Sequence, residues 1–289
     1  MFKNLSAGAI GVRDVTLAEA IELARAAGFE GIDFSIREAA QLADAHGVEY
    51  VRELFARAGI RPGQWGLPVA WNGEEEAWRR DLEDLPRLAA LGRQLGCTRT
   101  ATWCLPGSDE RPFDENFAWH VQRFKPIAQI LADHGCRLGI EFIGPKTMRD
   151  RFRYPFIYTL SGMMELANAI GTGNVGLLLD AWHLYTSGGT LDDLDQITAQ
   201  DVVTVHVNDA PEGVPRDELV DNVRCLPMET GVIDLPGFMR KLSAMGYDGP
   251  VTPEPFSERV NRIAATDPLA AARLVAEHMD RLWQASGLA

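Results

Sequence analysis

The fold can be read from four short, largely apolar runs in the second half of the chain: RLGIEF (137–142), VGLLLD (175–180), VVTVHV (202–207) and PVTPEP (250–255). Each run has the length of a strand, and a longer segment follows it. Each also carries an ionisable side chain at or next to its last position. Apolar strands that alternate with helices are typical of a parallel sheet covered by helices.

The same alternation extends through the first half of the chain. Segments such as TLAEAIELARAAG (16–28) have apolar residues at every third or fourth position, which indicates one face of a helix. Several of these segments end in a glycine, which accepts the backbone conformation that closes a helix. We predict four further strands here, which bring the total to the eight of a barrel: LSAGAI (5–10), GIDF (31–34), RPGQW (61–65) and RTATWC (99–104).

Two features favour a closed barrel over an open, doubly wound sheet. The turn after the first strand reads GAIGVRD and lacks the GxGxxG of dinucleotide-binding folds. Polar side chains also gather at the C-terminal ends of several strands, where barrel enzymes have their active sites. The chain has 289 residues, 46% of them apolar, which suits one large domain. We therefore predict a single α/β domain over residues 1–289, a (β/α)8 TIM barrel with its active site at the C-terminal strand ends.

Four strands in succession end in side chains that can bind a metal: Glu141, Asp180, His206 and Glu254. Consecutive strand ends surround one axis in a closed barrel, so these side chains can meet there. Carboxylates buried close together repel one another, and a divalent cation removes that cost. Three carboxylates with one imidazole suit Mn²⁺ or Mg²⁺ and also admit Co²⁺ or Zn²⁺. A single strand-end carboxylate could equally cap a helix or pair with an arginine, but four in a row favour a metal site.

Composition argues against several other classes of protein. The chain has 28 basic and 41 acidic residues, a net charge of -13, which disfavours nucleic-acid binding. It has no apolar run of about 18 residues, so we expect no membrane span. Its four cysteines form no CxxC, and we expect a cytoplasmic protein. One basic cluster, between Lys146 and Arg153, is either a solvated loop or a clamp for an anionic group.

Four motifs carry further information: LLLDAWHLYTSGG (177–189), VHVNDAP (205–211), DNVRCLPMETGVID (221–234) and PVTPEPF (250–256). With them the whole chain resembles the xylose-isomerase-like barrel superfamily, which holds sugar epimerases, ketose isomerases, inosose isomerases and dehydratases, and AP endonucleases of the endonuclease IV type. The resemblance implies that Glu141, Asp180, His206 and Glu254 are the metal ligands. It also implies that Glu141 and Glu254 act as acid and base. His183 matches a contact to a substrate oxygen, and Arg224 matches an arginine that grips the substrate.

Residue types separate the branches of this family. The AP endonucleases bind three zinc ions and need further His ligands at early strand ends, where this chain has Asp33, Trp65 and Trp103. Arg224 also stands where that branch has a zinc-binding His, and Asn222 stands where it has an Asp ligand. Arg offers no lone pair to a metal. The resemblance therefore implies one metal ion rather than three.

The other candidates for substrate binding are aromatic or charged. The indole faces of Trp65 and Trp103 can stack on a sugar, although ordinary packing in the barrel wall explains each equally well. Lys146 belongs to the basic cluster. The Pro-Gly-x-Gly that follows the arginine in epimerases is replaced here by Pro-Met-Glu-Thr-Gly (227–231), so the loop can differ and Glu229 can reach the site.

These assignments predict a metal-dependent isomerase or epimerase of a sugar, keto-sugar or inosose that works through an enediolate intermediate. We expect one divalent ion, Mn²⁺ in preference to Mg²⁺, Co²⁺ or Zn²⁺. The alternative is a metal-dependent dehydratase or lyase acting on a keto-sugar or keto-cyclitol, which shares the first chemical step. A barrel that only binds carbohydrate would not need both glutamates. We expect a small carbohydrate or cyclitol as partner, no nucleic acid and no membrane, and we leave open a homo-oligomer.

Overall fold

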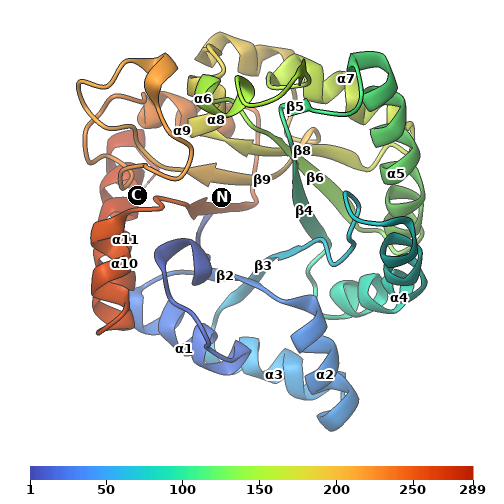
Figure 1. The fold of residues 1–289 in the computed structure, drawn as a ribbon. Coiled ribbons are helices and arrows are strands. Elements are labelled where there is room, and N and C mark those ends of the chain that lie inside the picture. Colours follow the sequence, from blue (N-terminus) through green and yellow to red (C-terminus); the bar gives the residue numbers. More distant parts are fainter. Residues whose placement is uncertain (289) are drawn as a thin grey trace.

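Eight parallel strands close into a barrel, and helices surround it (Figure 1). The computed structural model describes residues 1–288. The strands follow their chain order around the barrel, and the last pairs with the first. They are β1 (Phe2–Leu5), β2 (Gly31–Phe34), β3 (Arg61–Gly66), β4 (Arg99–Cys104), β6 (Arg137–Phe142), β8 (Val175–Asp180), β9 (Val202–Val207) and β10 (Pro250–Pro253). The structure confirms the predicted (β/α)8 barrel.

The surrounding helices begin and end at residues that suit helix caps. Thr16 and Glu19 exchange hydrogen bonds at the start of the first helix, which ends at the left-handed Gly28. No helix within residues 1–288 is long and apolar enough to cross a membrane. The helices are α1 (Leu17–Ala27), α2 (Ile36–His46), α3 (Val48–Ala58), α4 (Glu75–Gln94), α5 (Phe113–Asp133), α6 (Lys146–Arg149), α7 (Leu160–Ile170), α8 (Ala181–Thr186), α9 (Leu235–Ala244), α10 (Glu258–Ala264) and α11 (Pro268–Ser286), with 3-10 turns at Gly8–Ile10, Leu191–Gln196 and Arg216–Glu218.

Three features differ from the sequence prediction. The strand predicted at 5–10 is wrong, because Phe2–Leu5 pair with β2 and β10 while Gly8–Ile10 form a 3-10 turn. The last strand ends at Pro253, so Glu254 lies just beyond β10, and its backbone N–H donates to the Val207 carbonyl at 3.1 Å. A small antiparallel sheet of β5 (Gly107–Ser108) and β7 (Tyr154–Pro155) has strands too short to leave a periodic pattern.

The barrel contains buried polar side chains on several of its strands. Asn4 of β1 fits there because the next two strands, β2 and β3, have a glycine close to its side chain, Gly31 and Gly63. A Cβ added at Gly63 would lie 2.1 Å from Asn4 Oδ1, and one added at Gly31 would lie 2.7 Å from the same atom. The side chains that share this burial are Asn4, Gln64, Thr100, Thr204 and Thr252.

Candidate metal centre

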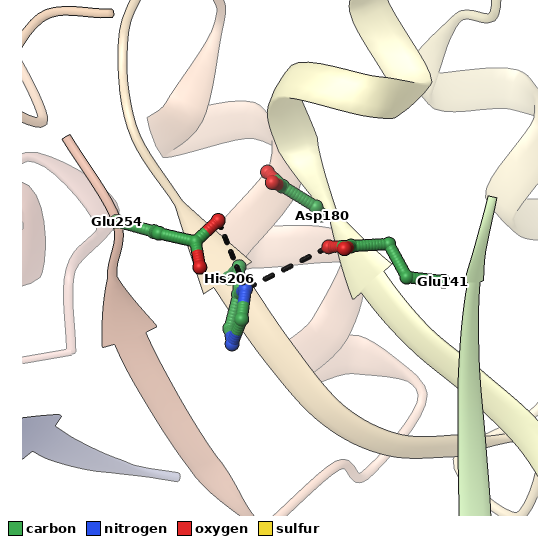
Figure 2. Close-up of side chains that lie close together, drawn as sticks. All are labelled: Glu141, Asp180, His206 and Glu254. Atoms are coloured by element: carbon green, nitrogen blue, oxygen red, sulfur yellow. Dashed lines mark ion pairs between the residues drawn. The ribbon is translucent and has the colours of Figure 1, made fainter. Parts of the chain in front are cut away.

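The four predicted ligands meet at the C-terminal end of the barrel (Figure 2). The β8–β9 register sets Asp180, the last residue of β8, beside His206 of β9. Glu141 comes from β6 and Glu254 from the residue after β10. One ligand atom of each residue lies within 4.8 Å of those of the other three. His206 Nδ1 is 3.6 Å from Glu141 Oε1 and 3.5 Å from Glu254 Oε2.

The three carboxylates of this cluster repel one another when no cation lies between them. Burial raises the pKa of Glu141 well above its usual value, and the nearby Glu254 raises it further. Burial likewise raises the pKa of Asp180. Burial alone would lower the pKa of His206, but Glu254, Glu141 and Asp180 outweigh it and raise that pKa to about 10. Protons therefore supply part of the positive charge that these carboxylates need.

The hydrogen bonding of the cluster is also incomplete. Glu141 Oε1 and both ring nitrogens of His206 are buried and have no hydrogen-bond partner within residues 1–288. Buried polar atoms without a partner are costly, and a bound ion is one common reason for them. Three carboxylates and one imidazole match the ligands that a hard or borderline divalent ion prefers. The residues present thus fit a divalent metal ion.

Arg224 is a second positively charged side chain in the cluster, besides protonated His206. Its side chain is buried, and its Nη1 donates to Asp180 Oδ2 at 3.0 Å and to Glu254 Oε2 at 2.9 Å. Its Nε and Nη2 donate to the backbone carbonyl and the carboxylate of Asp221, at 2.7 and 3.0 Å. Asp221 is not among the residues predicted from the sequence, although it opens the DNVR motif and lies three residues before the arginine. Arg224 thus links two of the four metal-ligand candidates to a carboxylate outside the set.

His183 lies beside Arg224 in a neutral form. Its Nδ1 accepts the backbone N–H of Gly144 at 3.1 Å, so this nitrogen cannot carry a proton without losing the bond. Burial, Arg224 and His206 together hold its pKa well below the usual value. Its Nε2 lies 3.3 Å from Arg224 Nη2 and is within 4 Å of Glu141, Asp180 and Asp221. With Nδ1 as the acceptor, a neutral His183 carries its proton on Nε2, the nitrogen that faces Arg224 and the carboxylates.

A pocket of about 410 Å³ opens above the cluster. Charged and polar groups line one part of it, and Trp103, Leu105, Ile143, Met148 and Phe256 line the rest. The Trp103 side chain is 41% exposed and stands edge-on to the buried Trp71, with the ring centroids 5.8 Å apart. Trp71 is fixed in turn by its indole N–H, which donates to Thr102 Oγ1 at 3.0 Å. Trp103, His183 and Arg224, three of the residues predicted from the sequence to contact the substrate, line this pocket.

Three other predicted substrate contacts lie outside this pocket wall. Trp65 is fully buried and donates its indole N–H to the Cys97 carbonyl at 3.1 Å, so it packs in the barrel wall. Lys146 pairs with Asp150 one turn along α6. Glu229 accepts the backbone N–H of Leu226 at 2.8 Å and closes its own loop. In the basic cluster around Lys146, the guanidinium groups of Arg149 and Arg153 lie over the rings of Tyr158 and Tyr154.

Known proteins share this architecture. An inosose isomerase from Bacillus velezensis is 23% identical over 266 residues, which cover 90% of this chain and 91% of that protein. A 3-dehydroshikimate dehydratase from Pseudomonas aeruginosa is 26% identical over 251 residues, 84% of this chain but 36% of that protein. The crystal structure of a xylose isomerase domain protein from Alicyclobacillus acidocaldarius is 32% identical, covers 99% of both chains and has a TM-score of 0.87.

The model of one protein family matches residues 21–282, nearly the whole barrel. The match includes every strand from β2 to β10 and all four residues of the carboxylate and histidine cluster. The family is described as the xylose isomerase-like TIM barrel. This chain belongs to the xylose isomerase-like TIM barrel family.

Proposed function

We propose that this protein is a metal-dependent isomerase or epimerase that moves a proton next to the carbonyl of a small, uncharged keto-sugar or keto-cyclitol. One observation carries the proposal: Glu141, from β6, and Glu254, from the residue after β10, approach the same imidazole nitrogen of His206. Two carboxylates that flank one point can act as base and acid on a substrate held between them. A site that only binds sugar would not need both.

The residues divide the work as follows. Glu141 and Glu254 each have two carboxylate oxygens, so each can contact a metal ion and still accept or return a proton at a substrate carbon. A divalent ion, for which we propose Mn²⁺, supplies Lewis-acid polarisation of the carbonyl when it is bound. The N–H groups of His183 and Arg224 orient the substrate hydroxyl groups. Return of the proton to the opposite face gives an epimer, and return to the adjacent carbon gives an aldose–ketose isomer.

The surroundings of the site favour isomerisation over loss of water. A lyase needs an acid that protonates the departing oxygen. His183 cannot fill this role while its Nδ1 accepts the Gly144 N–H. Glu229 is held in its own loop by Leu226 and lies away from the pocket wall. Apart from Glu141 and Glu254, which the proposal uses for proton transfer at carbon, neither residue is available as such an acid, and this supports retention of the hydroxyl.

The charge of the pocket favours an uncharged substrate. Glu141, Asp180, Asp221 and Glu254 surround a single guanidinium, that of Arg224, which already donates to three of them. A divalent ion would leave this group with a net negative charge. A phosphate or carboxylate on the substrate would be repelled there, and the pocket wall offers no second Lys or Arg. The apolar side chains beside Trp103 suit the C–H face of a neutral ring.

A screen of neutral ketohexoses and inososes with Mn²⁺ in deuterated water tests the proposal. We expect a product of unchanged formula that carries one solvent deuterium at the carbon next to the carbonyl. Phosphate esters of the same sugars serve as matched controls and should react far more slowly. A product lighter by one water would overturn the isomerase in favour of the dehydratase.

A further inference from the structure

His206 has a second ring nitrogen whose role the proposed chemistry leaves open. Its Nδ1 faces the carboxylates of Glu141 and Glu254. Its Nε2 lies on the other side of the ring and points away from the carboxylates of Glu141 and Asp180 (Figure 2). Nε2 is buried and has no hydrogen-bond partner within residues 1–288. A histidine that binds a metal through one nitrogen almost always donates the N–H of the other, which fixes the tautomer and the ring orientation.

A layer of hydrogen-bonded polar side chains begins directly beside this ring. In the β9–β10 register, His206 is the partner of Thr252. Thr252 Oγ1 accepts from Asn4 Nδ2 at 2.9 Å, and the same Nδ2 donates to Asp33 Oδ1 at 2.5 Å. Gln64 Nε2 donates to the other oxygen of Asp33 at 3.1 Å. The layer thus crosses β10, β1, β2 and β3, and Asp33 is the carboxylate at its centre.

Several polar atoms in and beside the layer are unsatisfied within the described residues. Asn4 Oδ1, Gln64 Oε1 and Thr204 Oγ1 are buried without a hydrogen-bond partner in the described chain, as is His206 Nε2. Thr204 lies two residues before His206 on β9. Buried waters commonly satisfy such groups by bonding to several at once. Water here would connect the imidazole N–H to the acceptors of the layer.

Asp33 also responds to the charge of the metal-binding residues. Burial raises its pKa to about 6, while the positive charge of His206 lowers that pKa and the negative charge of Glu254 raises it. Lowering of the pKa by His206 is the direction expected for a carboxylate close to its imidazole. No other carboxylate among the described residues takes part in the Asn4–Gln64–Thr252 hydrogen bonds.

We propose that Asp33 is a positioning residue for His206: through buried water in the Asn4–Thr252 layer it accepts the Nε2–H, and so keeps the Nδ1 lone pair free and aimed at the metal ion. The inference rests on the proposed metal centre. Asp33 need not touch the metal or the substrate. It acts on metal affinity through the tautomer and orientation of one ligand.

Calorimetric titration of the purified, metal-free protein with Mn²⁺ tests this role without any substrate. Asp33→Asn should weaken Mn²⁺ binding about 10- to 100-fold, the usual effect of removing such a partner. Asp14→Asn is the matched control, because Asp14 lines the same hollow as Asp33 but lies outside the hydrogen-bonded layer. It removes the same charge and should change the affinity less than about twofold.

Thermal unfolding of the metal-free proteins separates positioning from a structural role. Asp33→Asn should unfold near the wild-type temperature without metal and gain less from added Mn²⁺. If Asp33→Asn does not fold, Thr252→Val, which keeps the side-chain shape and removes the linking hydroxyl, takes its place with the same expected direction. Equal Mn²⁺ affinity in the variant and the wild type, or equal weakening in Asp14→Asn, would overturn the proposal. A wild-type protein that binds no metal would overturn the metal centre itself.

Discussion

Asp33 in β2 and Glu141 in β6 are both carboxylates near the end of a barrel strand, but their surroundings differ. The oxygens of Asp33 accept hydrogen bonds from Asn4 and Gln64, which the chain provides from the neighbouring strands. Glu141 has no such donor for its Oε1, and instead faces His206 and lies among other acids. The chain therefore satisfies both oxygens of Asp33 internally, and it leaves one oxygen of Glu141 without a donor.

The difference indicates which buried carboxylates of the barrel are suited to bind a cation or a proton. A buried carboxylate that accepts hydrogen bonds from amide groups needs no further proton or cation, because each oxygen has a partner. A buried carboxylate without them needs a cation or a proton from outside. Substitutions in the hydrogen-bonded layer around Asp33 and substitutions among the metal-ligand candidates should therefore differ in their effects. The largest effects are expected among the metal-ligand candidates.

The largest effect should come from the two glutamates. Glu141→Gln and Glu254→Gln should each lower kcat by about 10²–10⁴-fold at saturating metal, because an amide cannot act as the base or acid. Steady-state kinetics with the metal content measured in parallel checks this. Glu229→Gln, outside the pocket wall, should change kcat little. Normal turnover by either variant of the pair, with metal bound, would remove that residue from the proton transfer.

The next largest effect should be on stability in the presence of metal, when a metal ligand is lost. Asp180→Asn and His206→Ala should each abolish stoichiometric binding of one divalent ion per chain. At a metal concentration about 1,000 times the Kd, the wild type should gain about 4 kcal/mol of unfolding free energy, and the variants should gain none. Unfolding measured with and without Mn²⁺ gives the difference. Elemental analysis that finds three ions per wild-type chain would contradict the single site.

The pH dependence of metal binding follows from the same residues. Without metal, the surrounding carboxylates raise the pKa of His206 to about 10, so the imidazole carries a proton at neutral pH. The metal must displace this proton, and apparent affinity should therefore rise with pH until about pH 10. Titrations in buffers of different ionisation enthalpy would detect the released proton. An affinity independent of pH would contradict this assignment.

A smaller effect, on stability, is expected at Gly63, which leaves space for the side chain of Asn4. In Gly63→Ala the new Cβ would lie 2.1 Å from Asn4 Oδ1, so Asn4 must move and the protein should lose about 1–3 kcal/mol of stability. Gly66→Ala, in the same strand with nothing within 4 Å of its Cβ, is the matched control and should be nearly neutral. Urea unfolding measures both. The cost of Gly63→Ala should fall in an Asn4→Ala background, and an unchanged cost would rule out this clash.

The sequence is sufficient to predict most of the fold and the four residues of the cluster. Strand ends are visible as apolar runs, and an acid at the end of such a run stands out. The Asn4–Asp33–Gln64 layer is not visible in this way, because single polar residues inside short strands form no pattern. Asp221 is missed for a similar reason: its contact with Arg224 depends on how a loop folds over the site.

The two tryptophans show a second limit. Trp65 and Trp103 are each the fifth residue of their strand, so the sequence predicts the same depth in the barrel for both. Neighbouring strands of a barrel are staggered, however, and Trp65 pairs with Thr100 rather than with Trp103. Trp65 therefore lies deeper in the wall, while Trp103 pairs with Glu141 and reaches the pocket. The stagger is a property of the closed sheet, and no single strand reveals it.

This difference in depth gives the smallest of the expected effects. Trp65→Phe removes the indole N–H that donates to Cys97, and should lower stability by about 1 kcal/mol while KM stays unchanged. Trp103→Ala removes an exposed ring, and should raise KM several-fold with little change in stability, because stacking on a ring is worth about 0.5–1.5 kcal/mol. Thermal unfolding and steady-state kinetics on both variants separate the two roles. A rise in KM for Trp65→Phe equal to that for Trp103→Ala would mean that depth in the barrel wall does not decide which tryptophan contacts the substrate.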